Sequence, residues 1–291
     1  MRTAAMNDTA QMIEGLDGEV DRLVKQLEIP PCPSILTRIV REMHSDDPDL
    51  NKVAQWVAAD VGLAAAMLKT VNSPLYGLRN KATSVQQALI LLGLRNVAQL
   101  ITGLLLRQAF PVAQSAAMEH FWSNSAGVAA VCYVVARELK VCDSNQAYTF
   151  GLFRDAGMPA MLNKKKASYE DILTGEAFDG TAPITAVELA RYGLTHAQVG
   201  AYFGTSWHLD DNVWKAILLH HDYDKWPGRA REIAVRVAAM GLLSEEIYHR
   251  YSRNHSCPEW SLAAQTVFTV LGIDDGAVDD LRAEASRAFD T

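Results

Sequence analysis

The side chains that could do chemistry in this sequence are a few acidic, basic and imidazole groups in its second half. Arg154 and Asp155 are adjacent, His196 follows a threonine, and His220 and His221 form a pair. Imidazole and carboxylate groups are ligands of divalent transition metals, whereas a guanidinium stays charged and cannot bind a metal. Taken singly, each of these side chains is more typical of a packed, hydrogen-bonded residue. Because adjacent residues of a helix point in different directions, we expect only one histidine of the pair to face a given pocket squarely.

Other chemical signatures are weak. The four cysteines form no Cys-x-x-Cys pair, so the sequence does not predict a zinc knuckle. It contains neither a G-x-x-x-x-G-K-[ST] phosphate loop nor a G-x-S-x-G nucleophile elbow. Lys164, Lys165 and Lys166 form a short basic run that is typical of a solvated loop. The sequence therefore offers no ready-made nucleophile or phosphate cradle.

The composition is that of a globular protein with a large core. Of the 291 residues, 49% are hydrophobic and 21% are charged, and the net charge is -7. A mildly acidic chain without a basic recognition helix is not drawn to nucleic acid, so we expect no such partner. The polar start does not resemble a signal peptide, and no stretch approaches the roughly 18 apolar residues of a spanning helix. We therefore expect a cytoplasmic protein with reduced thiols and no membrane insertion.

Helical periodicity dominates the first third of the sequence. Across residues 53–71 the apolar side chains recur every three or four positions, which indicates helix rather than strand. Asp60 can cap a new helix, so this stretch is predicted to be two helices with a sharp joint. Residues 84–87 have the form of a capping box, and Gly93 is predicted to end the helix that follows.

The rest of the sequence predicts helix after helix. Helices are expected at residues 120–139, 146–162, 186–191, 196–207, 211–222, 229–249, 260–271 and 277–288. Thr195 can cap one of them, and Asp210 or Asp211 can cap the next. The predicted fold class is therefore all-α, a multi-helix bundle in two packed helical subdomains. The predicted units are a polar lead at 1–19, an N-terminal subdomain at 20–110 and a C-terminal subdomain at 111–291.

The N-terminal third contains four distinctive runs of residues: Ile29-Pro30-Pro31-Cys32-Pro33, Val57-Ala58-Ala59-Asp60, LKTVNSPLYG from Leu68 to Gly77, and SVQQALILLGLR from Ser84 to Arg95. In these runs the sequence resembles the HDOD family, whose name stands for an HD-related output domain. These runs are interpreted as structural, because asparagine and proline make a helix stop and a loop. The family implies an output or scaffold module of bacterial signal transduction.

The second half resembles the wider HD superfamily of metal-dependent phosphohydrolases, which implies an HD-like helical bundle. In that superfamily a histidine, a His-Asp pair and a later aspartate bind a metal, and related enzymes add histidines for a second metal. Such ions neutralise the phosphate and acidify a water. By this resemblance, Asn124 replaces the first histidine and Arg154 replaces the histidine of the pair. Residues 237–240, where the later aspartate is expected, contain no carboxylate.

Four residues of the pattern remain, namely Asp155 and the accessory histidines His196, His220 and His221. The resemblance implies that they line one degenerate pocket with Asn124 and Arg154. If Arg154 points inward, it repels a cation and pairs with Asp155, so we expect a locked centre with no metal and no catalytic residue.

The preferred interpretation is a non-catalytic signalling module, either alone or as part of a longer protein. It would bind a signalling protein or a small nucleotide-like ligand in a helical groove between the subdomains. The alternative is a divergent phosphohydrolase acting on a nucleotide or cyclic dinucleotide, with iron, manganese or zinc bound by Asp155 and the three histidines. The sequence leaves the oligomeric state open.

Overall fold

The computed structural model describes residues 18–27, 29–110, 116–165 and 168–289, and this part of the chain contains helices and turns but no strand. The all-α prediction is confirmed. Most of the predicted polar lead, Pro111 at the predicted boundary between the subdomains and Lys166 of the basic run lie outside the described residues. Lys164 and Lys165 belong to the end of a helix rather than to the predicted loop. None of the helices in the described part is long and apolar enough to cross a membrane.

The first group of helices confirms the local signals of the sequence. Its elements are α2 (Gly18–Lys25), α3 (Ser34–Met43), α4 (Leu50–Ala58), α5 (Val61–Val71), η1 (Pro74–Tyr76), α6 (Val85–Leu92) and α7 (Leu94–Ala109). The Asp60 carboxylate accepts the backbone N–H of Leu63, which fixes the predicted joint between α4 and α5. Gly93, with a φ of 79°, separates α6 from α7 as predicted.

The predicted capping box before α6 forms only in part. The hydroxyl of Ser84 accepts the backbone N–H of Gln87 as expected. The side chain of Gln87, however, accepts the backbone N–H and the hydroxyl of Thr83 instead of returning to Ser84. The helix is still capped, because one of its free N–H groups has found an acceptor.

The second group of helices follows the predicted order with shifted ends. Its elements are α8 (Ala116–Leu139), α9 (Ser144–Phe153), α10 (Gly157–Lys165), α11 (Glu170–Leu173), α12 (Ile184–Tyr192), α13 (His196–Ser206), α14 (Asp211–Leu219), η3 (Pro227–Arg229), α15 (Ile233–Arg253), α16 (Trp260–Leu271) and α17 (Asp275–Phe289). Thr195 and Gln198 form a complete capping box at the start of α13, and Asp210 caps α14.

The helix predicted at 146–162 is wrong, because α9 and α10 are separate helices with a turn at residues 154–156 between them. Pro159 explains the break. In the first turn of α10 its missing N–H costs no hydrogen bond, whereas one continuous helix would need that group. The start of α10 also packs tightly against α13, since a Cβ at Gly157 would lie 2.1 Å from the carbonyl oxygen of His196. Residues 154–156 therefore form a turn in the middle of the second group of helices.

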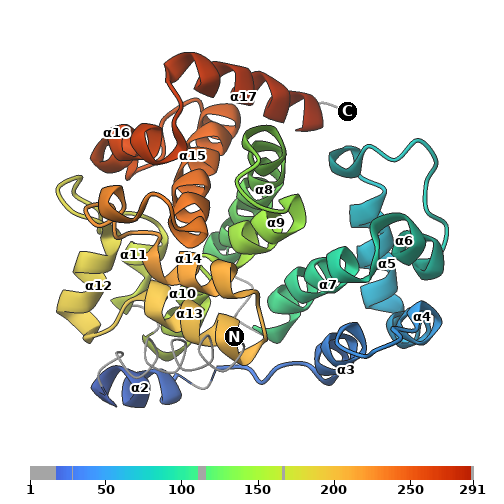
Figure 1. Cartoon of the computed structure of the whole chain (residues 1–291). Helices are drawn as coiled ribbons and strands as arrows, with labels where there is room; N and C mark the ends of the chain where they lie inside the picture. Colours follow the sequence, from blue (N-terminus) through green and yellow to red (C-terminus); the bar gives the residue numbers. More distant parts are fainter. Residues whose placement is uncertain (1–17, 28, 111–115, 166–167, 290–291) are drawn as a thin grey trace.

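The two groups of helices pack into one body (Figure 1). α8, α9, α14 and α15 pack against one another in the centre, and α7 packs on α9 from the side of α3–α7. Trp207, Trp214 and Trp226 are buried. α2 lies apart from α3, and its Leu23 lies against Gly193 at the end of α12. The division at residue 111 stays a prediction.

Candidate metal centre and adjoining cavity

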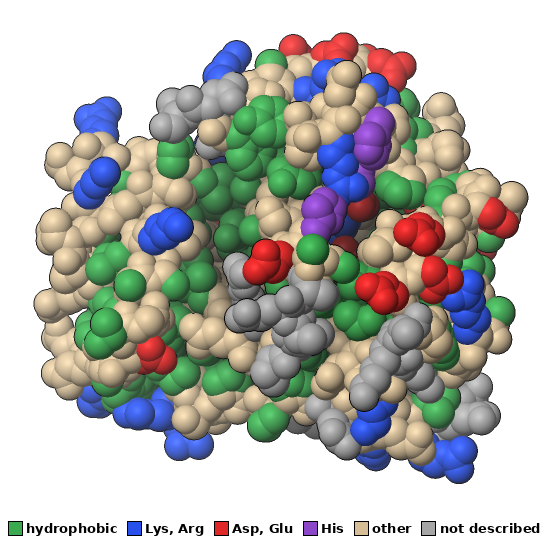
Figure 2. Space-filling view, turned by 180° about the vertical axis from the view of Figure 1, so that it is seen from behind, with side chains coloured by type: hydrophobic (Ala, Val, Ile, Leu, Met, Phe, Trp, Pro, Cys, Tyr) green, Lys and Arg blue, Asp and Glu red, His purple; other side chains and the backbone are tan. Residues whose placement is uncertain are grey.

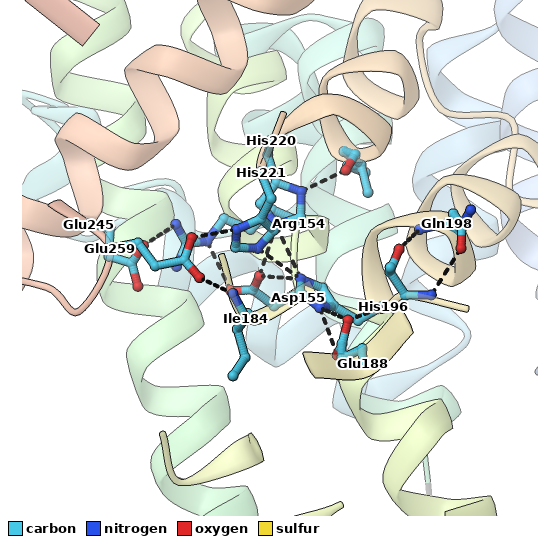
Figure 3. Close-up of polar contacts among 12 residues, drawn as sticks. Arg154, Asp155, Ile184, Glu188, His196, Gln198, His220, His221, Glu245 and Glu259 are labelled. Carbon is cyan, nitrogen blue, oxygen red and sulfur yellow. Dashed lines mark hydrogen bonds and ion pairs between the residues drawn. The ribbon is translucent and has the colours of Figure 1, made fainter. Parts of the chain in front are cut away.

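Three breaks in the helices bring the candidate site residues together (Figure 3). Arg154 and Asp155 lie in the turn between α9 and α10, and His196 is the first residue of α13. His220 and His221 directly follow the last residue of α14. The side chains of His196 and His220 are buried, whereas Asp155 and His221 are slightly exposed, at 16% and 13%. Helix ends from distant parts of the sequence therefore meet at one point.

The expectation that only one of the paired histidines would face this point squarely is wrong. It assumed a helix to residue 222, but α14 ends at Leu219 and both histidines lie in the turn beyond it. His220 itself helps to end the helix, because its Nδ1 donates to the carbonyl of Ile217 at 2.6 Å. Outside helical geometry, two adjacent side chains are free to converge.

The convergence is close. The Nε2 atom of His196 lies 3.2 Å from Nε2 of His220 and 3.2 Å from Nε2 of His221. Oδ1 of Asp155 lies 3.5 Å from Nε2 of His196 and 3.3 Å from Nε2 of His220. Each of the four residues offers one ligand atom, and these atoms all lie within 4.8 Å of one another. We call this set the His-Asp cluster.

The other nitrogen of each ring is engaged by an oxygen. Nδ1 of His196 lies 2.8 Å from Glu188, and Nδ1 of His221 lies 2.7 Å from Glu259. Nδ1 of His220 donates to a backbone carbonyl. Because these oxygens only accept, each Nδ1 carries its proton and each neutral ring presents a lone pair at Nε2. Three lone pairs and a carboxylate oxygen then face one another, which is favourable only with positive charge among them.

The donor set fits a divalent cation. Metal-binding histidines usually donate their second N–H to a carboxylate or a carbonyl, as all three rings do here. A tetrahedral site with bonds of about 2.0–2.1 Å has ligand atoms about 3.3–3.4 Å apart. Four of the six distances between the donor atoms of the cluster, at 3.2–3.5 Å, lie close to that spacing, and the other two are within 4.8 Å. Nitrogen and oxygen donors of this kind suit zinc, iron and manganese.

The surrounding charges also favour positive charge at His196. Burial lowers its pKa, but Glu188 and Asp155 overcome that effect and raise it to about 10. For His220, burial and the neighbouring His221 lower the pKa to about 3. Burial opposes ionisation of Glu259, but His221 holds the pKa of that carboxyl down at about 2. The cluster therefore combines fixed carboxylates with imidazoles that compete for a single positive charge.

Beside the cluster, Arg154 forms the predicted pair with Asp155. Its side chain is buried, so the possibility that it faces solvent is excluded. Nε of Arg154 lies 3.0 Å from Oδ2 of Asp155, an ionic contact without the alignment of a hydrogen bond. Nη1 donates to Glu245 at 3.0 Å. Burial would lower the pKa of Arg154, but the two carboxylates raise it, and they hold the guanidinium in place.

A cavity of about 310 Å³ opens beside these residues. It lies between α8, the turn before α10, and α15, and it is lined by five of the six predicted site residues: Asn124, Arg154, Asp155, His220 and His221. His196, the sixth, is fully buried behind them. The structure thus brings all six residues to one place, with the His-Asp cluster at the inner wall of the cavity.

Three carboxylates of the centre were missed by the sequence reasoning. Glu245 of α15 lies at the centre, where it pairs with Arg154. It comes eight residues after residue 237, at which the segment expected to hold an aspartate begins. Glu188 and Glu259 support the histidines from α12 and from the residue before α16. Neither has a recognisable spacing from its histidine, although fully buried acids of this kind nearly always have a partner. Only the tertiary structure pairs them.

These observations define an all-helical protein with a His-Asp cluster beside a buried ion pair. The pattern of the HDOD domain family matches residues 29–223, well over half of the sequence, and the chain belongs to this family. The resemblance in the first third of the sequence is thereby confirmed.

Two curated relatives are similar in sequence but carry no functional name. An uncharacterized protein of Treponema pallidum is 25% identical over 228 residues, which are 74% of this chain and 42% of the relative. The uncharacterized protein YuxH of Bacillus subtilis is 25% identical over 97 residues, 33% of this chain and 24% of the relative. The chain thus spans less than half the length of either relative.

Solved structures share the fold at low identity. A protein of Shewanella amazonensis SB2B whose name proposes a phosphohydrolase has a TM-score of 0.69 at 20% identity, covering 91% of this chain and 96% of its own. A protein of Marinobacter aquaeolei VT8 whose name proposes signal transduction has a TM-score of 0.67 at 22% identity, covering 91% and 59%. An HDOD protein of unknown function from Geobacter sulfurreducens has a TM-score of 0.61 at 22% identity, covering 92% and 97%.

Proposed function

We propose that this chain is a non-catalytic signalling module that binds a small anionic ligand in the cavity beside its degenerate HD centre. The observation that carries the proposal is the buried Arg154 guanidinium between Asp155 and Glu245. By the resemblance to HD phosphohydrolases, a histidine ligand of the first metal would occupy this position. A fixed positive side chain supplies charge there but can neither bind a metal nor acidify a water.

The His-Asp cluster serves this proposal as a binding element. Asp155 and the three histidines would hold one divalent cation of the zinc, iron or manganese type, and the ion would supply positive charge at the inner wall of the cavity. Four protein ligands are typical of closed, structural sites, whereas catalytic sites keep a position for water or substrate. The number of protein ligands therefore agrees with a metal ion that helps to bind a ligand rather than with one that catalyses a reaction.

The cavity is placed so that a bound ligand could be sensed by the other group of helices. α8, which contains Asn124, and α9, which Arg154 directly follows, also contact Tyr76 of η1. The Tyr76 hydroxyl donates to the Asn145 side chain at 3.4 Å, and its ring packs on Tyr133. A shift of α8 or α9 on ligand binding would move the loop that contains Tyr76. That movement could then change the surface that a signalling partner contacts.

A second function, metal-dependent phosphoester hydrolysis, is favoured by one observation. The three imidazole nitrogens and the Asp155 oxygen converge at the wall of a cavity large enough for a ligand. Asp155, His220 and His221 line that cavity directly, so a bound ion could meet a phosphate there. In this case Arg154 would assist the reaction by stabilising charge on the phosphate.

An activity assay separates the two functions. Purified protein is incubated with Mn²⁺, Fe²⁺ or Zn²⁺ and with bis(p-nitrophenyl) phosphate or a cyclic dinucleotide, and its metal content is measured in parallel. We expect up to one metal ion per chain and no hydrolysis above the protein-free control. Metal-dependent turnover that is lost in Asp155→Ala, but kept in the exposed-site control Asp279→Ala, would overturn the proposal in favour of the second function.

A further inference from the structure

The outer part of the cavity carries a second set of polar groups, distinct from the His-Asp cluster. On α15, Glu245, His249 and Arg253 follow one another at four-residue spacing and therefore share one face of the helix. All three line the cavity, and so do His120 and Asn124 of α8, the helix that packs against α15. Figure 2 shows histidine and basic side chains next to one another on one face of the molecule. Of these groups, Arg253 and His120 are exposed and lie at the mouth of the cavity, whereas Glu245 is half-buried and His249 is buried.

His249 has a buried polar atom with no partner. Its side chain is only 4% exposed, and its Nδ1 has no hydrogen-bond partner among the described residues. Its Nε2 lies 3.9 Å from Oε1 of Glu245, which is too far for a hydrogen bond. Leaving a buried polar group unpaired costs about 1–3 kcal/mol, so such groups call for a specific explanation. Oδ1 of Asn124 is unpartnered in the same way.

Arg253 lies at the mouth with most of its hydrogen-bonding capacity unused. Its Nη2 lies 2.8 Å from Nε2 of His120 and donates to that ring nitrogen. In the part of the chain that the structure describes, no carboxylate lies within ion-pair distance of this guanidinium. A guanidinium carries five N–H donors in a planar fork that suits phosphate and carboxylate oxygens. Its charge is therefore available to an anion that enters the cavity.

One part of the cavity wall is apolar. Phe121, Phe178, Ile184 and Leu242 line it. A ligand that spans the cavity must therefore combine an anionic group with an apolar or aromatic body. The volume of about 310 Å³ lies at the lower end of the range for small-molecule sites.

We propose that Arg253, His249 and His120 form an oxyanion subsite that binds the phosphate group of a small aromatic phosphomonoester, whose ring packs against the apolar wall. The proposal rests on the proposed function and names its ligand class. Arg253 supplies the charge, and Nδ1 of His249 gains the partner that it lacks. A phosphate suits the subsite better than a planar carboxylate, because its tetrahedral oxygens can accept from side chains on both α15 and α8 at once.

The test uses the whole chain in EDTA, with phenyl phosphate as the probe and benzoate as the planar counterpart, at constant ionic strength. Binding is measured by isothermal titration calorimetry. We expect phenyl phosphate to bind more tightly than benzoate, and Arg253→Gln and His249→Asn each to weaken phenyl phosphate about 10–100-fold, since hydrogen bonds to charged groups are worth about 1.5–3 kcal/mol. Arg282→Gln removes the same charge from an exposed site on α17 and is expected to leave the affinity unchanged.

Each other outcome counts against the subsite. Equal affinity of the wild type and of Arg253→Gln would overturn it, and so would phenyl phosphate binding that requires added zinc, because the phosphate would then sit on the His-Asp cluster. Loss of binding in the Arg282→Gln control would reveal non-specific attraction. Failure of the proposed function is a separate result: hydrolysis of a phosphoester with metal would end the non-catalytic assignment even if Arg253 still bound the phosphate.

Discussion

Replacing Glu188 by glutamine tests whether the cluster is built to hold a metal. Glu188 is fully buried, and its carboxylate only accepts hydrogen bonds. The donors are the Tyr169 hydroxyl, the backbone N–H of His196 and Nδ1–H of the His196 ring. A glutamine keeps the shape of this side chain but turns one of its two oxygens into an NH₂ group. If the remaining oxygen keeps the backbone N–H, it also keeps Nδ1–H of the ring at 2.8 Å, because one oxygen accepts both. The amide NH₂ then lies where the other oxygen stood, 2.9 Å from Nδ1, and the negative charge that makes Nε2 a stronger metal ligand is lost.

The magnitude follows from the weakening of one metal ligand. Changes in the groups that orient metal ligands typically weaken metal binding 10–100-fold. Zinc at 1,000 times the wild-type Kd should stabilise the wild type by about 4.1 kcal/mol, and a 100-fold weaker variant by about 1.4 kcal/mol at the same zinc concentration. In EDTA the Glu188→Gln variant should also lose about 1.5–3 kcal/mol, because a charged hydrogen-bond acceptor is gone.

The assay is urea unfolding with EDTA and with zinc, together with chelator competition for the Kd. Glu232→Gln is the matched control, because it makes the same chemical change at an exposed carboxylate that pairs with Arg229. We expect this control to behave as the wild type does. If Glu188→Gln folds and binds zinc within threefold of the wild-type affinity, the argument that the Glu188 carboxylate strengthens the His196 ligand is refuted.

Three further predictions concern the unfolding free energy, measured in urea. Gly157→Ala should lose about 1–3 kcal/mol or more, because its Cβ would meet backbone atoms at 2.1 Å, whereas Gly276→Ala, which meets only an ordinary contact, should gain about 0.5 kcal/mol. Arg154→Met should lose about 3–5 kcal/mol, because two carboxylates are left without their cation. Burial lowers the pKa of His249 from 6.5 to about 4, so the unfolded chain takes up this proton first as the pH falls. Stability should decline by up to about 3 kcal/mol from pH 6.5 to 4, and His249→Gln should decline less.

The sequence predicted the fold where the signals are local. The caps at Asp60, Thr195 and Asp210 each satisfy backbone groups within three residues, so a short stretch of sequence determines them. The break before α10 was also local, since Pro159 cannot lie inside one continuous helix, but the apolar periodicity around it concealed the signal. Helix ends were the least certain features, and the end of α14 decided where two histidines point.

The sequence named residues of the centre but not their arrangement. The resemblance gathered six residues, and the structure places five of them in the lining of the cavity and His196 behind them. The sequence did not reveal the carboxylates that pair with the histidines. Glu188 lies eight residues before His196, and Glu259 lies 38 residues after His221. Burial selects such pairs, because an ionised carboxylate without donors is costly inside a protein. The pairing is a property of the packed helices rather than of any motif.

The charges around the centre decide between a locked site and a metal site. Four carboxylates surround it, from Asp155, Glu188, Glu245 and Glu259, and a single guanidinium, that of Arg154, lies among them. Three negative charges remain uncompensated, and burial makes each of them costly. A proton on one imidazole removes one of these charges, whereas a divalent cation removes two and also satisfies the converging nitrogen lone pairs. Arg154 therefore supplies one positive charge at this centre, and the carboxylates behind the histidines still favour a cation beside it.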